Sequence, residues 1–269
     1  GSRGIAPQDA YQGRPGQFHL VLIKPSHYDD DGYVIQWLRS AIPSNTLATL
    51  NGLALDCVAR RVLGPGVEII ISSYDETNTR VRPRKIAADM RANGGRGLVA
   101  LVGVQTNQYP RSLDIARQLR AEGVQVAIGG FHVSGTIAML KGLQPEVQQA
   151  IDMGVSIFAG EAEFRLDEVL IDADKGTLKP VYNYMNDLPG IEQVPTPVLP
   201  RTRVKRTAGA HTSFDAGRGC PFQCSFCTII NVQGRKSRRR SPDDVERIVR
   251  ENVAQGVNRF FITDDNFAR

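Results

Sequence analysis

The sequence predicts an α/β protein whose first part is a doubly wound parallel sheet, and three observations support this fold class. Short apolar, β-branched runs alternate with segments of helical periodicity from His19 to about Gly176. Glycines precede several of the predicted strands, where they end the preceding helix. A second series of strand, loop and helix follows a proline-rich interruption. Such alternation is typical of parallel sheets that helices cover on both faces.

Five apolar runs predict the strands of this sheet, at residues 20–23, 67–72, 98–104, 124–128 and 156–159. Two of the intervening helices carry apolar residues at spacings of three and four, namely Leu47, Leu50, Ala54, Cys57 and Val58 in one and Ile115, Ala116 and Leu119 in the other. Five strands in alternation with helices predict a flavodoxin- or Rossmann-like sheet. Ligands of such sheets lie at the carboxyl ends of the strands, so functional residues are expected in the loops that follow them.

Composition divides the chain into four parts. Residues 1–17 are polar and rich in glycine and proline, which predicts a flexible tail, and residues 18–175 hold the predicted sheet. Residues 176–209 contain five prolines and show neither helical nor strand periodicity in their apolar residues, which predicts an extended linker. Residues 210–269 begin a second domain with a strand at 211–216 and another at 258–263. Between them, Ser241 and Asp244 form a capping-box pattern, and the helix that follows has an apolar face of Val245, Ile248, Val249 and Val253.

The composition indicates a folded globular protein. Of 269 residues, 41% are hydrophobic and 23% are charged, which excludes a wholly disordered chain. No apolar run has the length of a membrane-spanning helix, and residues 1–17 do not resemble a secretory signal, so a cytoplasmic location is expected. Four cysteines argue against a disulfide framework in a chain of this size, and three of them fall within eight residues, which favours a metal site.

The net charge of +5 raises the question of a nucleic-acid partner. Much of the excess lies in two basic runs, at residues 201–206 and 235–240, both close in sequence to the three clustered cysteines. One interpretation is a set of solvated basic loops beside a site for anionic cofactors, and the other is a surface for nucleic acid. We favour the first, because basic runs alone are a weak indication, and nucleic acid is not an expected partner.

Cys220, Cys224 and Cys227 form a C-x3-C-x2-C motif directly after the strand predicted at 211–216. Iron-sulfur clusters are held by thiolates, usually four of them. Three ligands on one loop leave one metal position open, as in catalytic rather than closed structural sites. The alternative is a structural zinc or an ordinary cluster with a fourth ligand from elsewhere. Cys57, the only other cysteine, is poorly placed for that role on the buried face of a predicted helix.

The spacing of these cysteines, and Phe226 just before the last of them, resemble the radical S-adenosylmethionine (SAM) enzymes. The resemblance implies that residues 210–269 are the first units of a partial (β/α)6 radical SAM barrel. It implies a [4Fe-4S] cluster on the three cysteines that cleaves SAM to a 5′-deoxyadenosyl radical, with electrons from an external donor such as flavodoxin or ferredoxin. Phe226 would lie by the adenine of SAM. Asp264 and Asp265 are candidates to face its methionine ammonium, although a turn or helix cap would explain them equally well. Residues 234–238 resemble a basic stretch that approaches SAM or substrate in several members.

The first domain resembles the cobalamin-binding domain that one branch of this family carries ahead of the cysteine loop. The resemblance covers roughly residues 18–175. Three motifs at the ends of predicted strands carry it, namely Lys24-Pro25-Ser26, Gly129-Gly130-Phe131-His132 and Gly160-Glu161-Ala162-Glu163. It implies cobalamin contacts from Gly129, Gly130, His132, Gly160 and Glu161, with glycines that allow the backbone to approach the ligand closely.

The sequence departs from one common cobalamin motif. Many such domains carry Asp-x-His-x-x-Gly after the first strand, and residues 25–32 do not match it. His27 in this loop is more simply explained as a solvated side chain than as a cobalt ligand. Several members with this domain bind cobalamin without histidine ligation, so the cofactor remains expected. The methylthiotransferase branch is excluded, because it needs three cysteines in the first domain and only Cys57 is there.

These features predict a cobalamin-dependent radical SAM methyltransferase that acts on a small molecule. The alternatives are a radical SAM enzyme whose first domain binds no cobalamin, and an RNA-modifying or nucleic-acid-binding protein that uses the basic runs. The sequence identifies neither the substrate nor a catalytic residue beyond the cofactor ligands. Only 50 residues run from Cys220 to the end of the sequence. A six-unit barrel needs roughly 180. We therefore expect a fragment with at most two barrel units and an exposed edge on the strand at 258–263.

Overall fold

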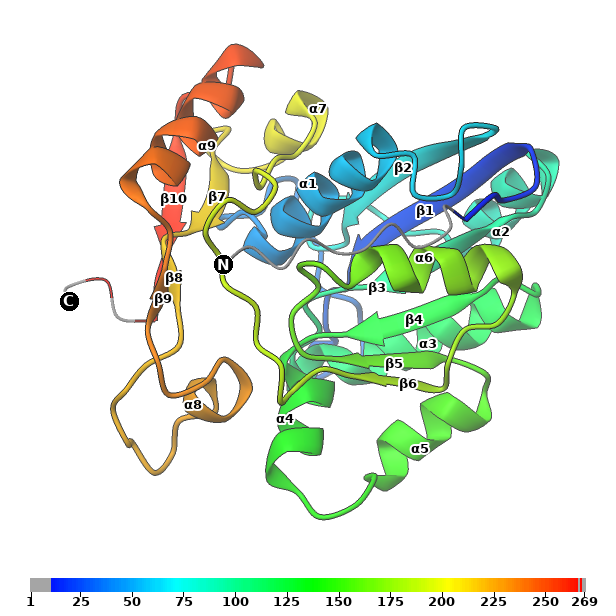
Figure 1. Cartoon of the computed structure of the whole chain (residues 1–269). Helices are drawn as coiled ribbons and strands as arrows, with labels where there is room; N and C mark the ends of the chain where they lie inside the picture. The colour runs from blue at the N-terminus through cyan, green and yellow to red at the C-terminus, as the bar shows by residue number, and fades with distance from the viewer. Residues whose placement is uncertain (1–10, 266, 268–269) are drawn as a thin grey trace.

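The computed structural model describes residues 11–265 and 267. Its main feature is a six-stranded sheet in the order β2-β1-β3-β4-β5-β6, in which every neighbouring pair is parallel (Figure 1). The strands are β1 (Gly16–Lys24), β2 (Val67–Asp75), β3 (Gly97–Leu101), β4 (Val126–Gly129), β5 (Ser156–Ala159) and β6 (Val181–Asn183). The order of the first five is that of flavodoxin-like doubly wound folds. The predicted fold class is confirmed.

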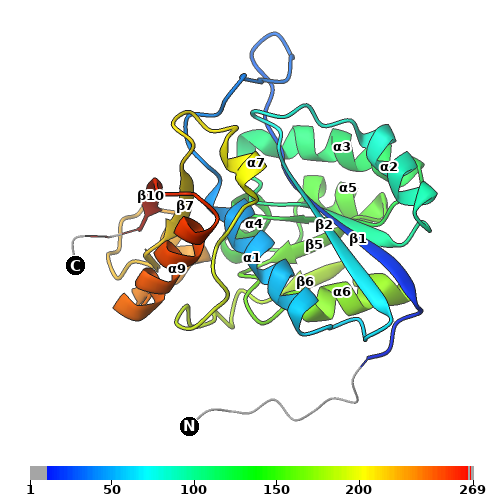
Figure 2. The same cartoon turned by 90° about the horizontal axis from the view of Figure 1, so that it is seen from above.

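Helices cover both faces of this sheet (Figure 2). One face carries α1 (Asn45–Ala59) and α6 (Leu166–Lys175), and the other carries α2 (Pro83–Ala92), α3 (Tyr109–Ala121), α4 (Phe131–Met139) and α5 (Pro145–Asp152), with a short 3-10 helix at Thr106–Gln108. Strand residues alternate between the two cores: Leu20 and Leu22 pack with the α1 and α6 residues, whereas Val21 and Ile23 pack with those of α2 and α3. The predicted strands are mostly apolar because both faces of the sheet are buried.

The proline-rich segment does more than connect two units. β6 lies inside it and pairs in parallel with β5, Ile157 facing Val181, so the sheet has one strand more than the sequence pattern indicated. Further along, the segment runs over α1, where the Val198 N–H donates to the Ala48 carbonyl over 3.0 Å. A side chain on Gly52 would lie 2.0 Å from the Thr196 carbonyl oxygen, so only glycine permits this approach.

The second unit lies beside the carboxyl ends of the main strands (Figure 1). Its elements are α7 (Arg201–Val204), β7 (Thr212–Asp215), β8 (Gly217–Arg218), α8 (Ile229–Val232), β9 (Arg238–Arg239), α9 (Pro242–Ala254) and β10 (Phe260–Thr263). β7 and β10 are parallel neighbours, and β8 and β9 form a small antiparallel ribbon. On β10, Phe261 and Ile262 are exposed. Strand, cysteine loop, helix and strand follow one another as the sequence predicted.

Helix α9 begins as expected but buries a different face. Ser241 accepts a hydrogen bond from the Asp244 N–H over 3.1 Å, and the capping box is complete. Of the predicted apolar face only Ile248 is fully buried, and Val253 is 48% exposed. Asp244 and Asn252 are buried instead, because both bond the backbone of residues 193–197. Contact with the linker therefore overrides the hydrophobic pattern of the helix.

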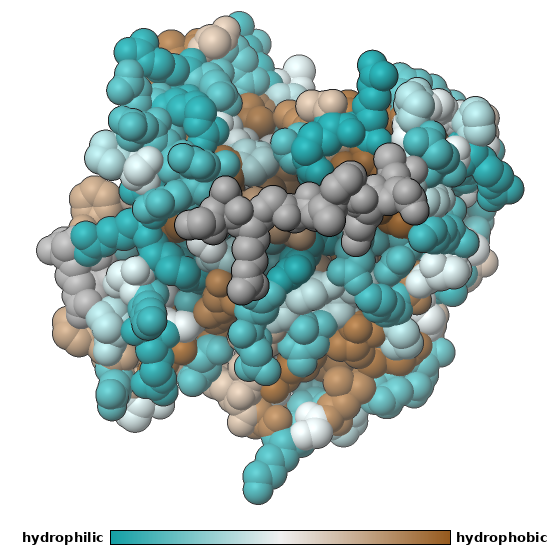
Figure 3. All heavy atoms as spheres, viewed as in Figure 1, coloured by the Kyte–Doolittle hydropathy of each residue, from teal (hydrophilic) through white to brown (hydrophobic). Residues whose placement is uncertain are grey.

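The surface on the face seen in Figure 1 is mostly hydrophilic, with apolar residues in smaller groups (Figure 3). Within the described residues, no helix combines the length and apolar character needed to cross a membrane.

Candidate functional site

An apolar cavity of about 180 Å³ opens at the carboxyl ends of the parallel strands, and we call it the strand-end cavity. Its walls come from the face of the sheet that α1 and α6 cover. They include Leu20 and Leu22 of β1, Leu98 of β3, Leu50 of α1, and Leu166 and Val169 of α6. The cavity thus lies where the topology of a doubly wound sheet places ligands, near the switch in strand order between β1 and β3.

Three buried polar atoms on the lining of the strand-end cavity have no hydrogen-bond partner among the described residues. They are Asn45 Oδ1 and Thr49 Oγ1 at the start of α1, and Gln233 Oε1 after α8. A buried polar atom without a partner costs about 1–3 kcal/mol. Native folds rarely retain several such atoms side by side. The lining is therefore suited to a ligand that is largely apolar and carries a few hydrogen-bonding groups.

Four of the residues predicted to contact cobalamin line this cavity, namely Gly129, Gly130, Gly160 and Glu161. Gly130 has a φ of 144°, and a Cβ there would lie 2.1 Å from the Val104 backbone nitrogen, so the close approach of two loops requires glycine.

His132, the fifth, is not part of the lining. Its ring packs against that of Tyr109 in a tilted arrangement at a centroid distance of 4.1 Å, and burial lowers its pKa. Its side chain thus packs against α3, and its role as a cofactor contact stays a prediction.

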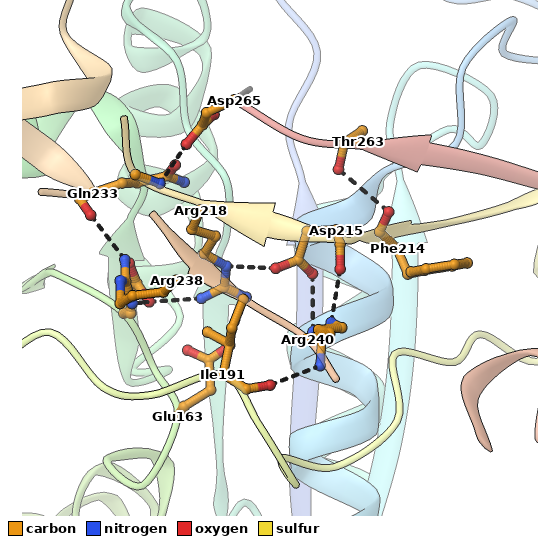
Figure 4. A network of polar contacts seen from close by, with 12 residues as sticks. Glu163, Ile191, Phe214, Asp215, Arg218, Gln233, Arg238, Arg240, Thr263 and Asp265 are labelled. Atoms are coloured by element: carbon orange, nitrogen blue, oxygen red, sulfur yellow. Dashed lines mark hydrogen bonds and ion pairs between the residues drawn. The ribbon is translucent and has the colours of Figure 1, made fainter. Parts of the chain in front are cut away.

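Glu161 and Glu163, which follow β5, connect the strand-end cavity to the cysteine-bearing unit through buried ion pairs. Figure 4 shows Glu163, Asp215 and Arg218 of this group. Arg218 of β8 is the centre of this network. Its Nη1 lies 2.8 Å from Glu161 Oε2, its Nη2 lies 2.7 Å from Glu163 Oε1, and its Nε lies 2.7 Å from Asp215 Oδ2. One guanidinium therefore joins the loop after β5 to the strand that leads into Cys220.

Two further arginines complete the network. Arg238 Nη1 also binds Glu161 Oε2, at 2.7 Å, and Arg240 Nη2 lies 3.0 Å from Asp215 Oδ1. Three arginines thus face three carboxylates, all of them largely buried. Burial disfavours the charge on Arg218, but the carboxylates outweigh it and hold the pKa of Arg218 well above its ordinary value.

This network corrects one expectation. The basic run at 235–240 was expected to be solvated, and that is wrong for Arg238 and Arg240, whose side chains are 15% and 0% exposed. Their sequence neighbours Arg235, Lys236 and Arg239 are exposed. Net charge cannot separate the two groups, because the compensating carboxylates are about 25 to 80 residues away along the chain.

The three cysteines lie on the loop between β8 and α8. Cys220 is buried, Cys227 is half-buried and Cys224 is exposed, and the Cys227 N–H donates to the Cys224 carbonyl over 3.1 Å. Phe226 between them is 90% exposed. Among the described residues, no three His, Cys, Asp or Glu side chains are arranged at metal-binding distances. Cys57 is buried within α1, where its thiol contacts Asp167 Oδ1 at 3.4 Å, consistent with its exclusion as a fourth ligand.

Asp264 and Asp265 follow β10 and lie against the approach to the cysteine loop. Asp265 Oδ2 accepts a hydrogen bond from the Gly219 N–H over 2.7 Å (Figure 4), and the Asp264 carboxylate lies beside Gly217. Asp265 therefore holds the backbone immediately before Cys220. The contact of both aspartates with SAM stays a prediction.

The sequence reasoning overlooked Arg218, Asn45 and Thr49. A signal for Arg218 was present, because a charged residue between two glycines directly before Cys220 stands in the motif itself. Asn45 and Thr49 are four residues apart on an otherwise apolar helix face, which places both on one side of α1.

Comparison with known proteins agrees with this fold, although no family model matches the chain. Bacteriochlorophyllide d C-8(2)-methyltransferase of Chlorobaculum tepidum is 30% identical over 184 residues, which are 62% of this chain and 38% of that enzyme. The radical S-adenosylmethionine methyltransferase TsrM of Kitasatospora setae, solved with cobalamin and a [4Fe-4S] cluster bound, superimposes with a TM-score of 0.58 at 15% identity. That match covers 93% of this chain and 49% of TsrM.

A third protein shares this fold. The cobalamin-dependent S-adenosylmethionine radical enzyme OxsB, solved with aqua-cobalamin and SAM bound, matches with a TM-score of 0.55 at 15% identity over 94% of this chain and 34% of OxsB. The chain spans less than half the length of each of these three proteins. The predicted resemblance is confirmed at the level of the fold, which the chain shares with the radical SAM methyltransferase TsrM and the cobalamin-dependent SAM radical enzyme OxsB.

Proposed function

We propose that the chain is part of a cobalamin-dependent radical SAM methyltransferase that acts on a small molecule. The observation that carries the proposal is the buried network around Arg218, which joins the strand-end cavity to the three-cysteine loop. A methyl transfer that uses both cofactors needs their two sites held in fixed relation, because reacting groups must meet in a defined geometry. The methyltransferase relatives support the same reaction class.

The lining of the strand-end cavity suits cobalamin on chemical grounds. The nucleotide tail of cobalamin ends in a flat aromatic base, and the apolar walls of Leu20, Leu98 and Val169 match such a group. The unpaired oxygens of Asn45 and Thr49 offer hydrogen bonds to its polar atoms. Gly130 and Gly160 keep the mouth of the cavity free of side chains.

The donor set of the cysteine loop suits an iron-sulfur cluster. Cys220, Cys224 and Cys227 are soft thiolate ligands with two or three residues between them, and a fourth cysteine within reach would have closed the site. The bound cofactors would supply the electron that cleaves SAM and the methyl group that is transferred. An external reductant such as flavodoxin or ferredoxin fits this requirement.

The residues of this chain would orient and enclose these groups. Asp265 fixes the Gly219 N–H and thereby the start of the cysteine loop. Arg218 ties the same loop to the rim of the cavity. Phe226, which is largely exposed, is available to cover the adenine of SAM.

The cluster is tested by anaerobic reconstitution of the chain with iron and sulfide, in the wild type and in Cys224→Ala. We expect a brown chromophore with about four irons per chain that the variant loses. Equal iron content in both proteins would contradict the assignment.

The corrinoid site is tested with hydroxocobalamin and a matched pair of variants. Thr49→Val and Thr212→Val each remove a buried hydroxyl that has no partner in the described structure, but only Thr49 lines the cavity. The free energy of unfolding should not fall in either case, since an unpaired buried group is lost. Corrinoid affinity should fall about tenfold in Thr49→Val alone, the equivalent of one hydrogen bond. Absent corrinoid binding in the wild type would instead favour a first domain without the cofactor.

A further inference from the structure

A second hollow, of about 460 Å³, lies on the opposite face of the sheet, beside the start of α2 and the flank of α3. Four arginines line it, namely Arg80, Arg82, Arg84 and Arg111, and we call it the arginine hollow. Val34 and Gln36 of the loop after β1 form another wall. None of these residues lines the strand-end cavity.

Glu76 and Arg111 form an ion pair at the base of the arginine hollow, so their charges cancel. Glu76 is 1% exposed and is the only carboxylate in the lining. Arg111 Nη2 lies 2.6 Å from Glu76 Oε1, and the Ser26 N–H donates to Glu76 Oε2 over 3.1 Å. The glutamate charge is thereby matched by Arg111. Three positive charges remain over the floor without a compensating carboxylate.

These three charges belong to Arg80, Arg82 and Arg84. Their side chains are exposed and form no ion pair or hydrogen bond within the part of the chain that the structure describes. Arg91 at the other end of the same helix shows the contrast, because it pairs with Glu122 at 2.7 Å. Three guanidiniums around one hollow repel one another, and an anion between them would relieve that repulsion.

The N-terminus of α2 adds to this positive potential. The helix has ten residues, its first turn contains no acidic side chain, and no side chain caps it. Its free N–H groups and the helix dipole favour a negative charge at this end. The N-terminus of α2 and the three arginines therefore both favour an anion in the arginine hollow.

We propose that the arginine hollow binds a small molecule through a phosphate or diphosphate group. A guanidinium presents a planar fork of donors that matches phosphate oxygens in pairs. Three guanidiniums need more acceptor oxygens than a single carboxylate provides, whereas a diphosphate supplies enough. The concave shape, closed on one side by Val34 and Gln36, favours a small ligand over the extended backbone of a nucleic acid.

The chain contains a built-in reporter for this site. Trp37 is its only tryptophan, follows Gln36 directly, and is 65% exposed. The backbone N–H of Trp37 donates to the Thr77 carbonyl over 2.7 Å, which ties Trp37 to the loop that carries Arg80. Intrinsic tryptophan fluorescence therefore comes from a single residue next to the arginine hollow.

The test titrates the full chain with inorganic pyrophosphate by calorimetry and by Trp37 fluorescence, at about 50 mM salt, where electrostatic binding is well expressed. We expect saturable binding of one pyrophosphate per chain, weaker binding of inorganic phosphate, and weaker binding of tricarballylate, a carboxylate of similar charge. Arg82→Gln/Arg84→Gln should lower pyrophosphate affinity at least tenfold, since a charge-assisted hydrogen bond is worth about 1.5 kcal/mol or more. Arg80→Gln alone should lower it less.

Arg250→Gln is the matched control, because Arg250 is an exposed arginine on α9, distant in sequence and outside the hollow. It should bind pyrophosphate like the wild type. The proposal is overturned if pyrophosphate does not saturate, if Arg250→Gln weakens binding as much as the double variant, or if tricarballylate binds as tightly. It is also overturned if a single-stranded RNA binds more tightly than pyrophosphate with a salt dependence that indicates more than three phosphate contacts.

Discussion

Replacing Arg218 by methionine should destabilise the protein strongly, because it leaves a buried carboxylate without a counter-charge. The Arg218 side chain is 9% exposed, and its partners Glu161, Glu163 and Asp215 are 8%, 2% and 4% exposed. The three carboxylates differ in whether a second arginine remains to pair with them. Glu161 keeps Arg238 and Asp215 keeps Arg240, whereas Glu163 has no second ion pair among the described residues.

The expected loss of stability follows from the number of carboxylates that are left without an ion pair. Removing one partner of a buried ion pair costs about 3–5 kcal/mol, mainly through the charge that remains. One such charge remains here, so Arg218→Met should lower the free energy of unfolding by about 3–5 kcal/mol. Domains are stable by about 5–15 kcal/mol, so the variant would lose a large share of the total.

Equilibrium unfolding in urea at neutral pH, followed by circular dichroism, measures this effect. Arg218→Met/Glu163→Gln should recover a substantial part of the loss, because the orphaned charge is gone, and the double-mutant cycle gives the coupling between the two residues. Arg250→Met serves as the control, since its partner Glu246 is exposed and such pairs contribute about 0–1 kcal/mol. A loss below about 1 kcal/mol in Arg218→Met would refute the reasoning, as would a double variant no more stable than the single one.

Three further outcomes are expected. Burial opposes ionisation of Asp244, but its hydrogen bonds prevail and lower its pKa from 3.8 to about 2. The ionised form therefore stabilises the fold above about pH 4, so Asp244→Asn should cost about 2 kcal/mol in urea unfolding at pH 7, and the difference should shrink as pH falls towards 2. Gly130→Ala should lower the free energy of unfolding more than Gly123→Ala. The new Cβ would lie 2.1 Å from the Val104 nitrogen in the first variant and in open space in the second. Equal losses in urea unfolding would show that the two loops can move apart. Phe214→Ala should cost about 3–5 kcal/mol, since Phe214 is 1% exposed, and a calorimetric scan that shows no loss would contradict its place in the core.

The sequence alone determined the elements whose signals are local. Apolar runs located β1 to β5, and the serine and aspartate of the capping box located the start of α9. The three cysteines were recognisable from spacing alone, and the pair Gly129-Gly130 and the single Gly160 were placed at the ends of β4 and β5. These features depend on residues within a few positions of one another, where backbone geometry limits the choices.

Features that depend on residues far apart in the chain became evident only in the folded structure. β6 forms because three residues of the linker find a free edge beside β5, and Asp244 is buried because the linker backbone offers it a donor. The basic run divided into buried and solvated arginines according to carboxylates supplied by the loop after β5 and by β7. Burial and charge compensation are properties of a place in the fold, so the sequence could name the cysteine loop, whereas only the packed chain could join it to a cavity through Arg218.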